Sequence, residues 1–370
     1  MIVDKTKWEI KTFNDVCTII HGKDHKTVND PNGKYPIYGS GGMMGRANNF
    51  LCNAGTTIIG RKGTINSPIY VNEKFWNIDT AFGLYPNEGV DSKYFYYYCK
   101  KFDFTKIQSG AAIPSLTRKD ILKQKFIIPC LIEQQGIAKE LDSIQAMIDG
   151  YKAHISDFDE LAKSLFLDTL GDPVINEKKW QIKSLSSLCN KMSTGPFGSM
   201  LHKSDYVVEG IPSVNPQNIK GSKVVIDGIA KVSYQKAEEL SKYYLKENDI
   251  ILARRGDLSK CAIITPKEQG WLCGTGSFFL HIEEVLPIVF YYQFTSKSIQ
   301  KQLLEKSIGA TMPNLNQGIL SKLMIPVPPI DIQQKFASQI EAIEKQKAIL
   351  CEQLADAEQL MAERMQYYFS

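Results

Sequence analysis

The sequence predicts an α+β protein in which two similar domains are joined by two long antiparallel helices, an intramolecular coiled coil with pseudo-twofold symmetry. Three observations support this prediction. The chain repeats itself once, each copy ends in a long heptad pattern, and short β-rich runs alternate with Gly-, Asn- and Pro-rich turns in the rest of each copy. Its 370 residues, 43% apolar and 23% charged, have the composition of an ordinary globular protein.

The internal repeat consists of short segments that return in the same order. Residues 8–12 (WEIKT) return at 180–184 (WQIKS), 58–63 (IIGRKG) at 251–256 (ILARRG), and 110–116 (GAAIPSL) at 309–315 (GATMPNL). The offset between the copies grows from 172 to 193 to 199 residues. The second copy therefore carries inserted loop residues in its front part, and the sequence predicts two homologous heads with different loops.

Each copy ends in apolar residues spaced alternately four and three apart, the pattern of a coiled-coil seam. The two seams comprise Ile137, Leu141, Ile144, Ile148, Ile155, Phe158 and Leu165 in the first copy, and Phe336, Ile340, Ile343, Leu350, Leu354 and Met361 in the second. Lys347 and Arg364 interrupt the second seam with charge. Each segment is long enough for a helix of roughly 55 Å, well beyond the usual three turns, so we expect the two to pair with each other.

Proline and glycine mark the boundaries of these segments. Pro129 and residues 326–329 precede the long helices, because the residue before proline avoids helical geometry. Gly171 and Pro173 end the first long helix. The predicted division is residues 1–130 for the first head, 131–170 for the central helix, 171–330 for a linker with the second head, and 331–370 for the C-terminal helix.

Charge is distributed unevenly over these four segments. Residues 1–130 hold 18 Lys/Arg and 11 Asp/Glu, and residues 171–330 hold 19 and 14. The helical segments are acidic, with 3 Lys/Arg against 8 Asp/Glu in 131–170 and 4 against 7 in 331–370. Basic heads and acidic helices indicate that the heads bind DNA and the helices bind protein. Ordinary surface variation is the alternative explanation for the charge of the heads.

No catalytic, metal or cofactor motif is found in the sequence. The eight cysteines are scattered without zinc-ligand spacing, no G-x-x-x-x-G-K-[ST] phosphate loop occurs, and no Asp/Asn-Pro-Pro-aromatic tetrapeptide of an amino-methyltransferase occurs. The glycine-rich segment 38–45 has the wrong spacing for a cofactor loop, and we expect a flexible loop there. The aromatic run 94–98 returns at 290–292, which favours a buried helix over a base-stacking surface.

The sequence also lacks the features of a membrane or secreted protein. No run of eighteen apolar residues occurs, and residues 1–5 lack the apolar core of a signal peptide. We therefore expect a cytoplasmic protein.

The order of these elements resembles the specificity subunits of Type I restriction-modification systems. The resemblance rests on two copies of a head opening with Trp-x-Ile-Lys, a Gly-Ala-x-x-Pro-x-Leu element, an Ile-Pro-x-Pro-like lead-in, a Gln-Gln helix start, and the junction LFLDTLGDP at 165–173. It covers nearly the whole chain. One departure is Cys130, which replaces the second proline of the first lead-in.

The resemblance implies a non-catalytic subunit with two target recognition domains, each of which reads one half of a bipartite asymmetric site in double-stranded DNA. The helices would set the unread spacer and dock two methyltransferase subunits, which use S-adenosylmethionine. Restriction and translocase subunits, which use ATP and Mg²⁺, would join them. No cofactor is then expected on this chain itself.

Candidate DNA contacts are polar, cationic or aromatic residues in turns of the two heads. They are Ser40, Arg46, Arg61 and Lys62 in the first head, and Thr194, Phe197, Asn215, Gln217, Asn218, Arg254 and Arg255 in the second. Arginine can bind guanine, and Asn or Gln can bind adenine, through two hydrogen bonds. The pairs 61–62 and 254–255 occupy matching places, so phosphate binding is their favoured role. For each single residue, a solvated turn remains an open alternative.

Two other functions stay open from sequence alone. One is a stand-alone DNA-binding or anti-restriction protein with the same architecture. The other is a methyltransferase whose motifs are not recognised. Copurification with methyltransferase subunits and methyl transfer by the isolated chain distinguish them.

Overall fold

The computed structural model describes residues 3–108, 115–307 and 314–370, which fall into two compact units. The first unit comprises Met1–His154 with Leu350–Ser370, and the second comprises Ile155–Ile349. Each unit contains one head and adjoining portions of the long helices α4 (Leu131–Leu170) and α10 (Ile330–Phe369). This division differs from the four predicted segments, because each head shares a hydrophobic core with the helix portions that pack on it.

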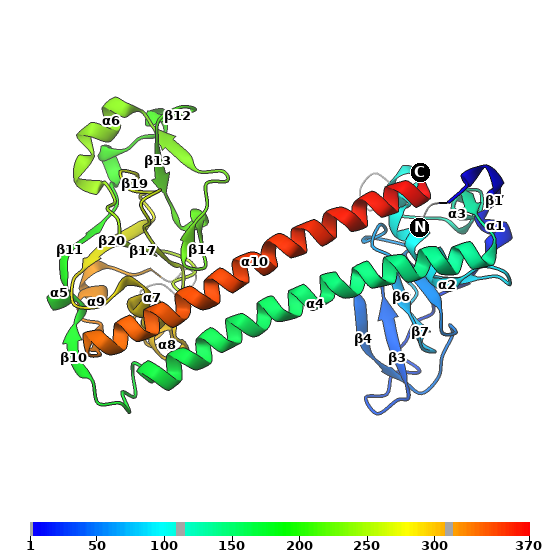
Figure 1. Cartoon of the computed structure of the whole chain (residues 1–370), viewed down its shortest axis with the longest axis horizontal. Coiled ribbons are helices and arrows are strands. Elements are labelled where there is room, and N and C mark those ends of the chain that lie inside the picture. The colour runs from blue at the N-terminus through cyan, green and yellow to red at the C-terminus, as the bar shows by residue number, and fades with distance from the viewer. Residues whose placement is uncertain (1–2, 109–114, 308–313) are drawn as a thin grey trace. The chain divides into compact units, whose positions relative to one another are not determined.

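The first head consists of small sheets and short helices (Figure 1). In chain order they are η1 (Lys5–Lys7), β1 (Glu9–Thr12), α1 (Phe13–Val16), β2 (Cys17–His21), β3 (Tyr35–Gly39), β4 (Gly42–Ala47), β5 (Thr56–Gly60), β6 (Ile69–Val71), β7 (Trp76–Asn77), β8 (Ala81–Pro86), α2 (Ser92–Lys101), η2 (Phe104–Ile107), α3 (Arg118–Leu122) and β9 (Lys125–Ile128). An antiparallel sheet has the order β2-β8-β5-β6, and a mixed sheet has the order β4-β3-β7. Strands β1 and β9 pair separately.

The core of the first head is aromatic. The ring of Phe13 lies edge-on to Phe95, Tyr98, Phe102, Phe104 and Phe126, with centroid distances between 5.6 and 6.4 Å. Tyr94, Phe95, Tyr97 and Tyr98 of α2 are buried, so the predicted buried helix over the aromatic run is confirmed. The hydroxyls of Tyr94 and Tyr98 donate to β9 carbonyls, which fixes α2 on that strand.

The second head repeats this plan with additions. In chain order its elements are β10 (Gln181–Ser184), α5 (Leu185–Leu188), β11 (Cys189–Thr194), η3 (Gly198–Met200), η4 (Lys203–Asp205), β12 (Tyr206–Val207), β13 (Ile211–Val214), η5 (Pro216–Asn218), β14 (Ile219–Lys220), β15 (Lys223–Val224), β16 (Ala230–Val232), α6 (Tyr234–Glu239), η6 (Ser241–Tyr243), β17 (Ile250–Ala253), β18 (Cys261–Ile263), β19 (Leu272–Cys273), β20 (Ser277–Ile282), α7 (Pro287–Thr295), α8 (Lys297–Lys306), α9 (Gln317–Ser321) and β21 (Met324–Val327).

The sheets of the two heads correspond strand by strand. The order β11-β20-β17-β18 repeats β2-β8-β5-β6, and β16-β13-β19 repeats β4-β3-β7, including the parallel pairing of its last two strands. The pair β10 and β21 repeats β1 and β9. The hairpin β14–β15 and helix α6 lie between β13 and β17 and have no counterpart between β3 and β5. This insertion accounts for most of the growth of the offset from 172 to 193 residues, and the further growth to 199 arises after β17.

The predicted antiparallel pair of long helices is confirmed within each unit (Figure 1). In the first unit, Glu140 and Lys152 of α4 form ion pairs with Arg364 and Glu358 of α10. In the second unit, Asp159 pairs with Lys347, and the rings of Phe166 and Phe336 lie 6.3 Å apart. Residues further along α4 thus meet residues earlier in α10, so the helices run in opposite directions. Gly171 ends α4 with a φ of 80°, where a left-handed backbone favours glycine.

The seam positions lie at the interface of the helices and the heads. The buried seam residues are Ile137, Leu141, Ile144, Ile148 and Met361 in the first unit and Phe336, Ile340 and Ile343 in the second; Ile155, Phe158, Leu165, Leu350 and Leu354 are half-buried. The two charged interruptions, Lys347 and Arg364, each face an acidic residue of α4. These ion pairs explain how charge is accommodated along the seam.

The glycine-rich segment 38–45 is a β-hairpin. Strands β3 and β4 pair antiparallel and are connected by a two-residue turn, Ser40–Gly41. The prediction of a flexible loop is wrong, because Ile37 and Ala47 are buried and their packing with the strand hydrogen bonds overrides the low strand propensity of glycine.

Candidate nucleic-acid interface

A basic turn follows strand β5 in the first head. Arg61 and Lys62 are exposed, and Gly63 has a φ of 77°, a conformation that favours glycine. The backbone of Arg61 is held at both ends, since its N–H donates to the Thr80 carbonyl at 2.8 Å and its carbonyl accepts from Leu116 at 2.9 Å. The Arg61 guanidinium also lies 5.9 Å from the ring centroid of Phe82. A fixed backbone therefore carries two exposed cations.

The second head builds the same turn after β17. Gly256 has a φ of 76°, the Arg254 N–H donates to the Gly276 carbonyl at 2.8 Å, and the Arg254 carbonyl accepts from Leu315 at 2.9 Å. Arg255 is exposed and Arg254 is half-buried. The Nε atom of Arg254 is buried and has no hydrogen-bond partner among the described residues.

A second loop packs beside the basic turn in each head. In the first head, a Cβ placed on Gly60 would lie 3.1 Å from the Cβ of Ser40, so the β3–β4 hairpin tip approaches the turn closely. In the second head, the Asn215 side chain accepts from the Gly276 N–H at 3.4 Å, next to the carbonyl that holds Arg254. We call these surfaces the first basic face (Ser40, Arg61 and Lys62) and the second basic face (Asn215, Gln217, Arg254 and Arg255).

Other predicted contact residues lie outside the two basic faces. Arg46 lies on β4 and donates to the carbonyls of Gly33 and Lys34 at 2.7 and 3.0 Å, so it holds the loop before β3. Thr194 is half-buried at the end of β11, and Phe197 beyond it is 54% exposed. Phe197 is therefore accessible to a ligand, whereas the guanidinium of Arg46 is engaged with its own head.

Asn218 has an internal role in this structure. It is 1% exposed, its side-chain oxygen accepts from the Asn215 N–H at 3.1 Å, and its amide donates to the Val225 carbonyl at 3.5 Å. A buried amide with these partners organises the loop and cannot contact a base edge in this conformation. Gln217, one residue earlier, is exposed.

Sequence reasoning missed three residues at these faces. Lys260 donates to the Pro216 carbonyl at 2.9 Å and so joins the turn after β17 to the loop after β13. Ser115 and Asn314 form isolated β-bridges with Lys62 and Arg255, in the same place of each copy. The repeat contained this signal, because both residues belong to the returning Gly-Ala-x-x-Pro-x-Leu element. Its first part, 110–114 and 309–313, lies outside the described residues.

Five of the eight cysteines are buried, Cys189 is half-buried, and Cys130 and Cys351 are exposed. Burial raises the pKa of Cys17, Cys52 and Cys189 to about 12, so they remain protonated at neutral pH. Among the described residues, no group of three or more His, Cys, Asp or Glu could hold a metal ion. The part of the chain that the structure describes also has no helix long and apolar enough to span a membrane.

The fold and the two faces together define a duplicated binding module, in which similar heads present basic turns on a common backbone frame. The chain belongs to the Type I restriction modification DNA specificity domain family, whose model matches residues 5–156 and 177–359. The two matched segments coincide with the two copies of the repeat. The sequence-based prediction of a specificity subunit, rather than of a catalytic subunit, is thereby confirmed at the level of the family.

Individual relatives agree with this assignment. The chain is 24% identical over 315 residues to the Type I restriction enzyme MjaVIII specificity subunit of Methanocaldococcus jannaschii, which covers 79% of this chain and 70% of that protein. The fold of this chain is similar to that of the Type-I restriction-modification system S subunit from M. genitalium. The TM-score is 0.63 and the identity 16%, and the match covers 99% of this chain and 97% of that chain. A solved structure that concerns the complex assembly and conformational transition of the type I R-M system also has a similar fold. The TM-score is 0.59 and the identity 14%, and the match covers 98% of this chain and 97% of that chain.

Proposed function

We propose that this chain is the sequence-specific DNA-binding specificity subunit of a Type I restriction-modification complex. Each head reads one half of a bipartite asymmetric site in double-stranded DNA. Helices α4 and α10 set the unread spacer and dock two methyltransferase subunits. The chain has no catalytic centre in this proposal: S-adenosylmethionine binds to the methyltransferase subunits, and ATP and Mg²⁺ bind to the restriction and translocase subunits.

The observation that supports the proposal most directly is the pairing of a shared turn with an unshared loop. Phosphate contacts position a protein on DNA, whereas contacts to base edges specify sequence. Both heads hold their basic turns by equivalent backbone hydrogen bonds, which suits a common phosphate contact. The neighbouring loops differ, with Ser40 in one head and Asn215 and Gln217 in the other, which suits two different half-sites.

The properties of the long helices support the assignment of protein partners to the helices rather than to the heads. Residues 131–170 and 331–370 are both acidic, so they repel phosphate rather than attract it. Exposed apolar side chains also occur on the helices, including Met147 and Leu161 on α4 and Ile349 and Leu360 on α10. Apolar residues among charged ones suit a protein interface.

The test is to sequence methylated positions in host DNA with and without this gene. We expect a bipartite motif, two short defined sequences separated by an undefined spacer, that disappears when the gene is deleted. Copurification with methyltransferase subunits is expected at the same time. A chain that purifies alone and leaves methylation unchanged would support the stand-alone DNA-binding alternative, and methyl transfer by the isolated chain would support a catalytic one.

A further inference from the structure

Both long helices have a pair of adjacent glutamines near their N-terminus, and in each pair one side chain is buried and one is exposed. Gln134 of α4 and Gln333 of α10 are each 1% exposed, whereas Gln135 and Gln334 are exposed. A buried side-chain amide needs both its donors and its acceptor satisfied. The contacts of these two residues therefore show what each pair does.

Gln134 makes three hydrogen bonds, all to backbone atoms outside the helix. Its Nε2 donates to the carbonyls of Gly89 and Pro129 at 3.1 and 2.9 Å, and its Oε1 accepts from the Asp91 N–H at 2.8 Å. Pro129 precedes α4, while Asp91 is the N-cap of α2. One amide thus joins the start of the long helix to the start of a helix within the head.

Gln333 repeats all three bonds in the second head. Its Nε2 donates to the carbonyls of Glu284 and Pro328 at 3.0 and 2.8 Å, and its Oε1 accepts from the N–H of Leu286, the N-cap of α7, at 2.8 Å. Because every partner is a backbone atom, the arrangement persists although the side chains around it differ. We call Gln134 and Gln333 with these partners the glutamine joints.

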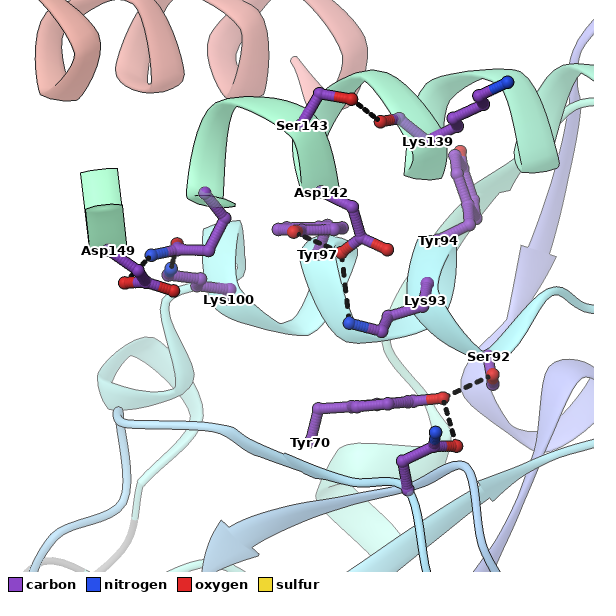
Figure 2. Close-up of polar contacts among 12 residues, drawn as sticks. Tyr70, Ser92, Lys93, Tyr94, Tyr97, Lys100, Lys139, Asp142, Ser143 and Asp149 are labelled. Atoms are coloured by element: carbon purple, nitrogen blue, oxygen red, sulfur yellow. Dashed lines mark hydrogen bonds and ion pairs between the residues drawn. The ribbon is translucent and has the colours of Figure 1, made fainter. Parts of the chain in front are cut away.

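A second set of contacts further along the helix supports each joint. In the first unit, Asp142 of α4 accepts from Lys93 at 3.0 Å and from Tyr97 at 2.7 Å, both on α2 (Figure 2). Lys100, also on α2, donates to Gln145 of α4 at 3.1 Å. Two attachments along one helix prevent α2, and the head with it, from rotating on α4.

The second unit replaces this polar set with aromatic rings. Tyr292 of α7 lies 5.8 Å from the Phe166 ring and 5.3 Å from the Phe336 ring, measured between centroids. The glutamine joint is therefore the polar attachment that both heads share, which points to a role common to both heads rather than to one half-site.

We propose that Gln134 and Gln333 are positioning residues that fix the angle at which each head leaves its helix, and thereby restrict the DNA spacer that the complex accepts. This inference rests on the proposed function. It follows from geometry, since a small rotation at a joint is amplified across the head, whose basic face is what contacts DNA. The half-site sequences themselves do not depend on the joints.

The test compares Gln134→Met and Gln333→Met with the matched controls Gln135→Met and Gln334→Met in the assembled methyltransferase complex. The substrate is a DNA library with fixed half-sites and spacers one and two base pairs shorter and longer than the native one. We expect methylation at off-length spacers to rise about tenfold relative to the native spacer in the joint variants, because three hydrogen bonds are lost, and to stay unchanged in the controls.

The outcomes separate positioning from stability and from the proposed function. A uniform loss of methylation at all spacers, or a change of half-site bases, would overturn the inference. If the Met variants fail to assemble, Lys93→Met with Tyr97→Phe loosens the second attachment of the first head, because it removes both hydrogen bonds to Asp142 and keeps the buried ring of Tyr97. The same broadening is then expected, and unchanged spacing there overturns the inference as well. Absence of bipartite methylation in the wild-type complex would instead refute the proposed function.

Discussion

The two heads share a backbone plan but stabilise it with different side chains. Phe13, at the centre of five aromatic contacts in the first head, corresponds in the repeat to Leu185, which is buried among mostly aliphatic residues. The second attachments differ likewise, with an ion pair and a tyrosine hydroxyl in the first unit and aromatic rings in the second. What is common to both is the strand order, the basic turn and the buried glutamine.

This comparison separates what the architecture requires from what each head is free to vary. Core chemistry changed between the copies because many apolar sets fill the same volume. The turn backbones and the glutamine joints did not change, because each depends on hydrogen bonds that few other residues can make. We therefore expect substitutions in the shared features to act alike in both heads and substitutions in the cores to act differently.

The largest effect is expected from the cores. Phe13→Ala should lower the free energy of unfolding of the first head by about 3–5 kcal/mol, and Leu185→Ala should lower that of the second head by about 2–5 kcal/mol. Phe13→Leu should still cost about 1–3 kcal/mol, because the rings around Phe13 leave a space that leucine does not fill. Hydrogen exchange under increasing urea, followed on peptides from each head, assigns the loss. A cost of Phe13→Leu well below about 1 kcal/mol would contradict the difference between the cores.

The basic turns should behave alike. Arg254→Ala with Arg255→Ala, and Arg61→Ala with Lys62→Ala, should each weaken DNA binding by the assembled complex about 10- to 100-fold without dissolving the complex. Each double variant should also lower the slope of log affinity against log salt by about 2. Fluorescence anisotropy at several salt concentrations measures both. The control is Lys297→Ala with Lys301→Ala on α8, exposed cations outside the basic faces. Unchanged affinity at physiological salt would remove the turns from the interface.

Asn218 and Gln217 are adjacent in the second head, and substituting each of them separates a role in loop structure from a role in base reading. Asn218→Ala should lower the stability of the second head by about 1–2 kcal/mol, because it leaves the Asn215 N–H and the Val225 carbonyl unpaired. Gln217→Ala should change stability by less than about 0.5 kcal/mol, since the side chain is exposed. Methylated-site sequencing then tests base reading: a relaxed base at one position with Gln217→Ala supports it. If Gln217→Ala leaves the motif unchanged, the residue does not read a base.

Much of the fold could be predicted from the sequence, because it follows from periodicity. The repeat, the heptad spacing and Gly171 are local patterns whose physical consequences do not depend on the rest of the chain. The hairpin over 38–45 could not be predicted, since its stability comes from the burial of Ile37 and Ala47 against residues distant in sequence. The prediction relied on the local glycine content, whereas the hairpin is stabilised by tertiary packing that the local sequence pattern does not show.

The candidate interface was less predictable than the fold. Residue type selects Asn218 and Gln217 equally, yet burial separates them, and burial is decided by a turn whose hydrogen bonds connect Asn215, Asn218 and Val225. The basic turns were identifiable because they are repeated, and so were the paired glutamines at each helix start. Only the structure shows that one glutamine of each pair is buried, because two adjacent residues of the same type cannot be told apart by residue type alone.

A small effect is expected at the charged interruptions of the seam, which also differ between the units. Lys347 pairs with Asp159 in the second unit, and its side chain is only 23% exposed. Burial lowers the pKa of Lys347, but its hydrogen bond to Asp159 and the charges of Glu344 and Asp159 outweigh this and raise the pKa above its ordinary value. Lys347→Met should change local stability by less than about 1 kcal/mol, because the apolar side chain suits the seam and Asp159 is half exposed.

The pH dependence of the stability difference between wild type and Lys347→Met gives the sharper test. A folded-state pKa above the unfolded value means that the ion pair contributes fully below the unfolded pKa of lysine, about 10.4, and that the contribution is lost as pH rises through the folded pKa. The difference between wild type and Lys347→Met should therefore stay constant from about pH 7 to 9 and shrink only above that range. Opening free energies of peptides from 330–349, obtained by hydrogen exchange at several pH values, measure it. A wild-type stability that instead rises relative to Lys347→Met between pH 7 and 9 would mean that the folded-state pKa of Lys347 is lowered, because the unfolded chain would then bind more protons than the folded one, and that burial rather than pairing dominates at this position.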